Sequence, residues 1–363
     1  MGAARTERDW ELIKGVLPAG WEKAAIERRA IRRDQGPLAK PEALLRLLLG
    51  KAASDKSNRE TAAEAGLTGL AEVSDVAIHK RERQSGDWLE WIADGLLGGT
   101  MNELPQGPFR LRLVDATTVS VPGSKGTDFR LHVCVNLPDR RFSHAELTNK
   151  HGGETLMRFP VMPGDIYVGD RAYGTSKGVG HVVAGSGMPL VRITTSALPL
   201  YMADGERIDL LGSARPLEPG QMLDVDAWAK TPQEGAVAGR LCIYALSEED
   251  AQRAARRVRR RASRQKGRPP GARAVEGSRY IFIFTTASRG LMSVAQVFAC
   301  YRLRWQVELA FKMLKTVLRF GKLPNHRDDT SRTWLLAKLI NALILERLAR
   351  ADQRAFPPGR VAA

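Results

Sequence analysis

Four residues near the C-terminal end carry side chains that could do chemistry together. They are Tyr301, Arg304, Glu308 and Lys315, and they lie within residues 292–320, a segment without Gly or Pro. Such a segment predicts one long helix, and on a period of 3.6 residues the four side chains fall along one stripe. A carboxylate flanked on its own face by a phenol, a guanidinium and an ammonium suits a site that holds both a metal ion and a phosphate.

Two aspartates upstream provide further carboxylates. Asp115 lies in the β-branched run Leu111–Val121, which opens after a joint rich in Pro and Gly at residues 105–108. Asp170 follows the short apolar run Ile166–Gly169. Carboxylates at strand ends can converge with one on a later helix, and oxygen ligands are those that Mg²⁺ prefers.

Phosphodiester cleavage needs a deprotonated water and a stabilised leaving oxygen, and two divalent ions about 4 Å apart supply both. We therefore expect Asp115, Asp170 and Glu308 to be the catalytic and metal-binding residues, with Asp115 shared by the two ions. Taken singly, each has an ordinary explanation: a strand-end aspartate for the first two, and a surface ion pair with Arg304 or Lys312 for Glu308. The combined pattern favours the metal site.

The pattern resembles the DDE transposases of bacterial insertion sequences, in the branch called the insertion-sequence-four type. The signature of that branch is Tyr, two residues, Arg, three residues, Glu, six residues and Lys, and residues 301–315 meet it. Asp-x-Thr at 115–117 and Gly-Asp-Arg-x-Tyr at 169–173 resemble its two acidic blocks. The resemblance covers roughly residues 40–350. It implies cut-and-paste transposition, in which the element ends are cut and then transferred into target DNA.

The resemblance also implies a cofactor and partners. We expect Mg²⁺, with Mn²⁺ able to substitute, and no ATP, because the Gly-Ser-Lys-Gly stretch at 123–126 lacks the Walker spacing. Double-stranded DNA, as transposon ends and as target, is the expected partner. Because two ends must be brought together, we expect a homodimer on DNA.

The composition agrees with a polyanionic partner. The chain has 363 residues, 43% of them hydrophobic, and its 56 Lys and Arg exceed its 40 Asp and Glu to give a net charge of +16. Such an excess points first to nucleic acid. We find no run of roughly 18 apolar residues that would predict a membrane span and no apolar signal core. The three widely spaced Cys favour a reducing compartment, so we expect a bacterial cytoplasmic protein associated with the nucleoid.

Residues 1–104 predict an all-α region, which we expect to bind the DNA ends. The pair of helices at 58–65 and 75–83 is loosely helix-turn-helix in style, with an ordinary helical bundle as the alternative. Gly, Pro and capping residues separate the expected helices, which are Glu7–Leu17, Ala19–Arg33, Pro41–Leu49, Asn58–Ala65, Asp75–Arg83 and Asp87–Leu97.

The remaining chain predicts an α/β fold. Residues 105–197 and 289–350 are expected to form the catalytic core, which the resemblance implies is ribonuclease-H-like. The stretch between them, 198–288, is longer than an α/β core needs, so we expect a β-rich insertion there and a tail at 351–363. The expected strands are Leu111–Val121, Phe129–Asn136, Phe142–Thr148, Ile166–Gly169, Pro189–Thr194, Leu223–Trp228, Arg240–Ala245 and Arg279–Thr285.

Several side chains are candidates to bind DNA phosphates. By the resemblance, Tyr301, Arg304 and Lys315 would bind a phosphate near the cut end, where Arg can grip it bidentately and Lys acts as a point charge. Arg171, beside Asp170, is a further candidate.

A dense basic run at residues 253–268 lies inside the insertion, and its first part predicts a helix. We expect it to contact DNA phosphates. Each phosphate neutralised in this way makes the logarithm of the binding constant fall by about 0.9 more for each tenfold rise in salt concentration. A solvated loop is the alternative. The candidates within the run are Arg256, Arg257, Arg260 and Arg261.

Two aromatic residues could hold an unpaired base. Trp305 could stack on one, although a Trp on a helix that packs on a sheet is more often core. The resemblance implies an aromatic on the last strand of the insertion that holds a flipped base. Tyr280 is the nearest candidate, with Phe282 as runner-up and a cross-strand packing pair as the alternative.

We therefore interpret the chain as a DNA transposase of an insertion sequence. Two alternatives stay open: a non-catalytic DNA-binding remnant or regulator derived from a transposase, and a metal-dependent nuclease without strand transfer. The intact acidic triad argues against the remnant, because drift would be free to erase it. Related proteins often carry further C-terminal helices used in pairing, so we expect this chain to be capable of cleavage yet poor at transposition.

Overall fold

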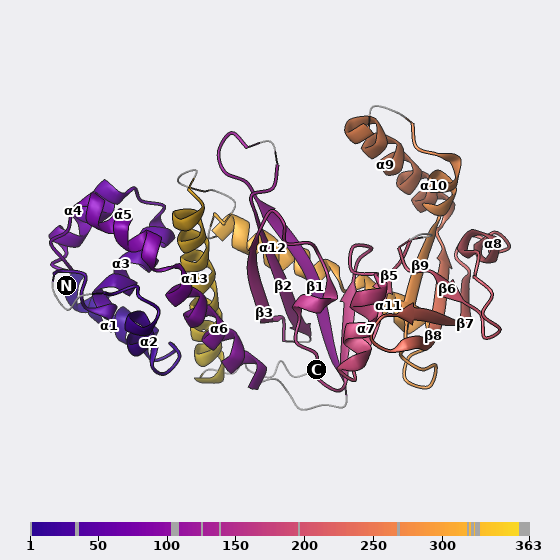
Figure 1. Cartoon of the computed structure of the whole chain (residues 1–363), viewed down its shortest axis with the longest axis horizontal. Helices are drawn as coiled ribbons and strands as arrows, with labels where there is room; N and C mark the ends of the chain where they lie inside the picture. Colours follow the sequence, from indigo (N-terminus) through magenta and orange to yellow (C-terminus); the bar gives the residue numbers. More distant parts are fainter. Residues whose placement is uncertain are drawn as a thin grey trace, which may run out of the picture.

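The structure is a computed structural model, and it describes residues 2–32, 36–102, 109–124, 126–137, 139–194, 197–266, 269–317, 319–320, 323 and 327–355. The joint expected at 105–108, residue 125 of the Gly-Ser-Lys-Gly stretch and residues 356–363 of the expected tail lie outside these ranges. Within them, no helix has both the length and the apolar character needed to cross a membrane. Figure 1 shows an elongated molecule with a group of helices at one end and a long sheet through the rest.

Each segment expected to be helical in the N-terminal region contains a helix. Local signals explain several helix starts. Pro41 stands in the first turn of α3, Ser57 and Glu60 form a reciprocal capping box at α4, and Ser74 accepts a hydrogen bond from the Ala77 N–H at α5. The helices are α1 (Gly2–Lys14), α2 (Trp21–Glu27), α3 (Pro41–Ser54), α4 (Asn58–Leu67), α5 (Asp75–Gln84) and α6 (Gly86–Asn102).

In the described residues, nine strands form one mixed sheet in the order β3-β2-β1-β4-β5-β9-β8-β7-β6, which confirms the α/β fold class. The first three strands form an antiparallel meander, β4 and β5 run parallel to β1, and β9 returns antiparallel beside β5. Every expected strand is present, and β6 is an additional one. The strands are β1 (Arg110–Val119), β2 (Phe129–Leu137), β3 (Arg141–Asn149), β4 (Asp165–Gly169), β5 (Met188–Arg192), β6 (Leu200–Tyr201), β7 (Met222–Thr231), β8 (Gly235–Ala245) and β9 (Tyr280–Thr285).

Alternating side chains of the sheet build a separate core on each face. On β1, Leu113 and Val119 belong to a core shared with α6 and with residues 305–317, whereas Val114 belongs to a second core shared with α7. Because side chains alternate along a strand, Asp115 lies on the same face as Leu113. Further helices on and around the sheet are η1 (Leu156–Arg158), α7 (Ser176–Ala184), α8 (Leu210–Ala214), α9 (Glu248–Lys266) and α10 (Ala272–Gly277).

The prediction of one long helix over residues 292–320 is wrong. Two helices, α11 (Val294–Arg302) and α12 (Trp305–Val317), stand in its place. Between them the N–H groups of Leu303, Arg304 and Gln306 donate to carbonyls three residues back at 3.0, 3.1 and 2.9 Å, the pattern of a tighter 3₁₀ turn. The expected stripe is therefore divided: Tyr301 lies on α11, Arg304 in the turn and Glu308 on α12.

The last described helix, α13 (Asp328–Ala355), packs back against the N-terminal helices and lies beside α6 in Figure 1. Its Lys338 donates to Asp55 Oδ1 at 2.5 Å, just after α3. The other carboxylate oxygen of Asp55 accepts from Arg319 at 3.3 Å, shortly after the end of α12. Asp55 thus ties the helical layer to the C-terminal end of the helix that carries Glu308.

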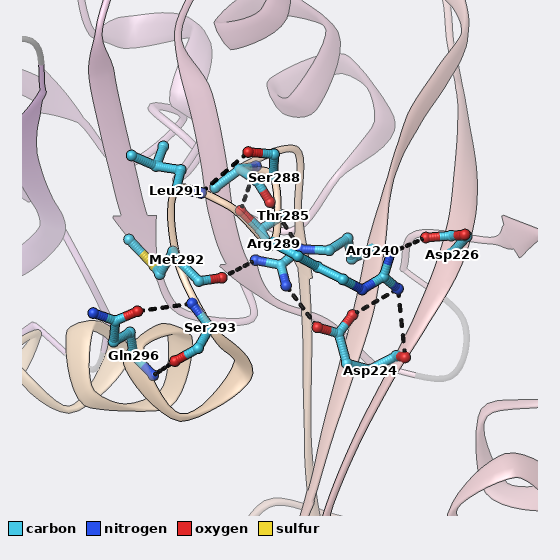
Figure 2. A network of polar contacts seen from close by, with 11 residues as sticks. Asp224, Asp226, Arg240, Thr285, Ser288, Arg289, Leu291, Met292, Ser293 and Gln296 are labelled. Atoms are coloured by element: carbon cyan, nitrogen blue, oxygen red, sulfur yellow. Dashed lines mark hydrogen bonds and ion pairs between the residues drawn. The ribbon is translucent and has the colours of Figure 1, made fainter.

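A polar network, drawn in Figure 2, connects the start of α11 to β7 and β8. Arg240 on β8 is 3% exposed and donates to the carbonyls of Ala287 and Met292, both at 2.7 Å, and to Asp224 Oδ2 on β7 at 2.6 Å. Ser293 follows directly and caps α11. The strands β7 and β8 therefore help to position α11, which leads into the turn that holds Arg304.

Replacing Arg240 with Met tests this network. The variant leaves Asp224 with the half-exposed Arg289 alone, and breaking a buried ion pair from one side costs about 3–5 kcal/mol. We expect urea denaturation to show a free energy of unfolding lower by about 3 kcal/mol. The matched control is Arg215→Met, because Arg215 contacts Glu276 at 2.7 Å with a side chain 58% exposed. Arg215→Met should lower the free energy of unfolding by no more than about 1 kcal/mol. An equal decrease in the two variants would contradict the account.

Candidate active site

A guanidinium group lies at the centre of the predicted site. Arg304 donates to Asp115 Oδ2 at 3.0 Å and to Glu308 Oε1 at 2.9 Å. Asp115 is on β1 and Glu308 is in the first turn of α12, so this one side chain joins the sheet to the helix that covers it. The side chains of Arg304 and Asp115 are 21% and 19% exposed, and partial burial strengthens the attraction between them relative to a fully solvated pair.

Strand pairing sets Asp170 beside Asp115. In the parallel pair of β1 and β4, Leu113 lies opposite Val168, so the two aspartates, each two residues further along, continue the same register. Neighbouring strands lie about 4.8 Å apart. The N–H of Ala172 donates to Asp170 Oδ1 at 2.9 Å and holds the carboxylate at the end of the strand. Two carboxylates this close repel each other unless a cation lies near them.

Burial and neighbouring charges raise the pKa of Asp115 to about 6. Burial is the main cause, and the charges of Asp170 and Glu154 add to it. The N–H of Ala116, which donates at 2.8 Å, and the guanidinium of Arg304 act in the opposite direction. The negatively charged form of Asp115 is therefore disfavoured in the protein alone, and a divalent cation bound nearby would stabilise it.

Cationic and phenolic groups surround these acids. Burial and the charge of Arg192 lower the pKa of Arg171, and the phenol of Tyr301 acts on Arg171 in the opposite direction. Burial alone would lower the pKa of Arg304, but Tyr301 and the two carboxylates raise it. The structure therefore brings Tyr301, Arg171 and Arg304 together. Lys315 lies two turns beyond Glu308 on α12 and is exposed.

Two residues of this region were not singled out from the sequence. Arg192 ends β5, and because Gly169 pairs with Val191, Arg192 continues the register opposite Asp170. Its position in the last part of the expected strand Pro189–Thr194 was the available signal. Glu154 lies in the loop after β3, and its charge acts on Asp115. Nothing local in the sequence marks Glu154, because its place depends on how that loop folds back.

The two aromatic candidates differ in exposure. Trp305 is 50% exposed at the start of α12, so its ring is accessible beside the acids. Tyr280 is 8% exposed and its ring lies 6.0 Å from that of Phe282. Both rings take part in core packing on β9.

The basic run forms the second part of α9, which projects away from the end of the sheet in Figure 1. The first turn is acidic, with Arg253 paired to Glu249 and Asp250. The charge of Arg261 also lowers the pKa of Arg171, after burial and Arg192, so α9 extends positive charge from the site outward. The exposed candidates on this helix are Arg256, Arg257, Arg260 and Arg261.

The donor set fits a divalent cation. Carboxylate oxygens are the ligands that Mg²⁺ and Mn²⁺ prefer, and a cation relieves the repulsion between them. As the side chains stand, the described part of the chain contains no group of three or more His, Cys, Asp or Glu that could hold a metal ion. Arg304 lies between Asp115 and Glu308, and rotation of this one side chain would free oxygens of both carboxylates.

Comparison with known proteins gives relatives for most of the chain. Residues 106–344 match the family model of the transposase DDE domain. The transposase for insertion sequence element IS421 of Escherichia coli is 31% identical over 342 residues, which cover 92% of this chain and 90% of that protein. InsL for insertion sequence element IS186A, from Escherichia coli strain K12, is 31% identical over 341 residues, with the same shares covered. A solved piggyBac transposase synaptic complex with hairpin DNA has 9% sequence identity and a TM-score of 0.42 over 97% of this chain and 84% of that chain, a likeness too low to support a conclusion.

The raised pKa of Asp115 predicts how metal-free protein responds to pH. Its folded pKa of about 6 exceeds the ordinary 3.8, so the group stabilises the fold fully below pH 3.8, and this contribution is lost as the pH rises through 6. Asn does not titrate. In EDTA, the free energy of unfolding of Asp115→Asn relative to wild type should rise by about 1 kcal/mol between pH 5 and pH 7.5 in urea denaturation. A difference that stays constant over this range would contradict the raised pKa.

Proposed function

The chain belongs to the DDE transposase family and is an insertion-sequence transposase, and we propose that it cuts DNA at the ends of its element and joins those ends to target DNA. The observation that carries this mechanism is the meeting of carboxylates from three elements. Asp115 and Asp170 share one strand register, and Glu308 reaches the same guanidinium as Asp115. Core packing alone does not require that acids so far apart in sequence come together.

The catalytic core is proposed to be ribonuclease-H-like. The antiparallel meander β1–β3 followed by the parallel strands β4 and β5 supports this fold. The strands β6–β9 are proposed as a β-rich insertion that continues the sheet, and α1–α6 as the region that recognises the element ends. The capped pair α4 and α5 is consistent with such a role.

DDE transposases generally use a divalent metal, and we propose Mg²⁺, with Mn²⁺ able to replace it and with no ATP. Asp115, Asp170 and Glu308 would hold the metal. Bound there, a divalent ion activates a water and stabilises the leaving oxygen. The chain itself contributes the register of β1 and β4, which sets the two aspartates side by side, and the packing of α12, which brings Glu308 over them.

Arg304 has two sets of partners in this mechanism. In the absence of DNA its guanidinium pairs with Asp115 and Glu308. When the carboxylates hold metal, the same guanidinium turns to a phosphate beside the cut end, which it can grip bidentately, together with Tyr301 and Lys315. The exchange keeps the partly buried charge of Arg304 paired in both states, and leaving it unpaired would be unfavourable.

Double-stranded DNA is proposed to run from the site along α9. Arg171 and the exposed arginines of α9 would contact its phosphates, and the exposed ring of Trp305 would stack on an unpaired base near the cut. Two element ends require two active sites, so a homodimer on DNA is proposed. Such a protein would work on the bacterial chromosome in the cytoplasm.

The proposal is tested with purified protein, the inverted-repeat ends of its own element, and Mg²⁺ or Mn²⁺. Glu308→Gln should bind the end DNA as wild type does yet lose more than about a hundredfold in cleavage rate, because even outer partners of metal ligands contribute 10- to 100-fold. Glu27→Gln is the matched control: Glu308 pairs with Arg304 at 2.9 Å and Glu27 with Lys23 at 3.2 Å. Both pairs are four residues apart, and the two glutamate side chains are 60% and 58% exposed.

Denaturing gels separate the possible outcomes. End-specific cleavage and joined products from wild type and Glu27→Gln, but not from Glu308→Gln, support the proposal. Tight binding with no cleavage by any of the three proteins would contradict it and favour a DNA-binding remnant. Cleavage without joined products would favour a nuclease that lacks strand transfer.

A further inference from the structure

The loop that carries Glu154 is held in place on both sides of that residue. The carbonyl of Gly152 accepts a hydrogen bond from Arg130 Nη1, and the carbonyl of Gly153 accepts one from Arg158 Nε at 2.8 Å. After Glu154, the Thr155 hydroxyl accepts from the N–H of residue 157 and starts η1. Glu154 is therefore fixed by its neighbours rather than carried on a free loop.

The carboxylate of Glu154 lies over the second face of the sheet. Its Oε1 is 3.6 Å from Arg130 Nε, and its side chain is 29% exposed. Arg130 sits on β2 between Phe129 and Leu131, which pack in the core that α12 shares, so alternation places Arg130 on the opposite face. Glu154 thus approaches the strand ends from the side away from Glu308.

Tyr173 lies on the same face of the sheet as Glu154. Its side chain is completely buried and packs in the second core, where its ring lies 6.3 Å from that of Phe159. A Cβ added at Gly169 would meet Tyr173 Cβ at 2.8 Å, so the ring is tightly seated against the end of β4. Its hydroxyl is buried and has no hydrogen-bond partner in the described part of the chain, and buried hydroxyls normally have one, often a water.

The N–H of Tyr173 donates to the carbonyl of Asp170 at 3.1 Å, and the charges of the two aspartates act on Tyr173 and Glu154. Burial, and after it the charges of Asp115, Glu154 and Asp170, raise the pKa of Tyr173. Burial raises the pKa of Glu154, with Asp170 adding to it and Arg130 opposing. A third carboxylate beside two others is unfavourable for the protein alone, and becomes favourable when a divalent cation and its waters are bound there.

Resting on the proposed function, we propose that Glu154 and the Tyr173 hydroxyl form the outer shell of the metal site, as positioning residues. They hold, through water, the cation that Asp115 and Asp170 bind, on the side away from Glu308. Mg²⁺ keeps several of its waters in protein sites, and groups that orient such waters tune affinity by 10- to 100-fold.

Three variants in the full-length chain test the inference. Glu154→Gln removes the charge and keeps the shape, and Tyr173→Phe removes only the hydroxyl. Glu146→Gln is the matched control, because Glu146 on the neighbouring strand β3 also pairs with an arginine, Arg158, at 2.7 Å. Binding of Mn²⁺ to the protein bound to end DNA is followed by electron paramagnetic resonance, and cleavage is measured over a range of Mn²⁺ concentrations.

We expect the Mn²⁺ concentration for half-saturation to rise about tenfold in Glu154→Gln, by less in Tyr173→Phe, and not at all in Glu146→Gln, with end-DNA affinity unchanged throughout. At saturating Mn²⁺ the cleavage rate should largely recover. If both site variants bind Mn²⁺ as wild type does, whatever their melting temperatures, Glu154 is only a partner of Arg130 and the inference is wrong. If Glu154→Gln does not fold, Tyr173→Phe alone decides in the same way. Wild type that neither binds Mn²⁺ nor cleaves would overturn the proposed function and this inference with it.

Discussion

The guanidinium of Arg304 lies between two carboxylates that come from different layers of the fold. Asp115 belongs to the sheet and Glu308 to the helix that covers it, and without a cation their charges, with that of Asp170, would push α12 away from β1. At 3.0 and 2.9 Å, Arg304 supplies that cation from within the chain. The same contact accounts for the helix break just before α12. The 3₁₀ turn places the Cα of Arg304 so that its side chain lies between the two carboxylates instead of on the outer face of a continuous helix.

The rest of the architecture holds the two halves of this contact in register. On the sheet side, pairing of Leu113 with Val168 brings the two aspartates to the same level. On the helix side, Arg240 anchors the chain just before α11 from within the insertion, and Asp55 holds the chain just after α12 from the N-terminal helices. The helical layer and the proposed insertion, which we propose to contact DNA, are therefore each attached to one end of the helix pair α11 and α12, which carries Tyr301 and Glu308. If either region moved on binding DNA, the position of Arg304 would change as well.

Much of this could be predicted from the sequence, because the strands and the acidic residues within or just after them leave strong local patterns. The β-branched run around Asp115 and the apolar run before Asp170 locate β1 and β4 within a residue or two. The helix break at residues 303–304 could not be predicted, since no Gly or Pro marks it and the competing force is a contact with a distant strand. The exposure of Trp305 and the burial of Tyr280 could not be predicted from the sequence either. Both aromatic residues fit amphipathic segments, and only tertiary packing decides which ring is covered. Glu154 belongs with these, because its approach to the aspartates depends on a loop held by Arg130 and Arg158.

The central claim is that Arg304 exchanges two carboxylates for a DNA phosphate when the metal binds. It is tested most directly by a structure of the chain with its end DNA and Mn²⁺, in which anomalous scattering locates the metal. The account predicts Mn²⁺ at about 2.1 Å from carboxylate oxygens of Asp115, Asp170 and Glu308, with the Arg304 guanidinium turned to a phosphate. Mn²⁺ bound elsewhere, or Arg304 still bridging Asp115 and Glu308 in the DNA complex, would contradict it.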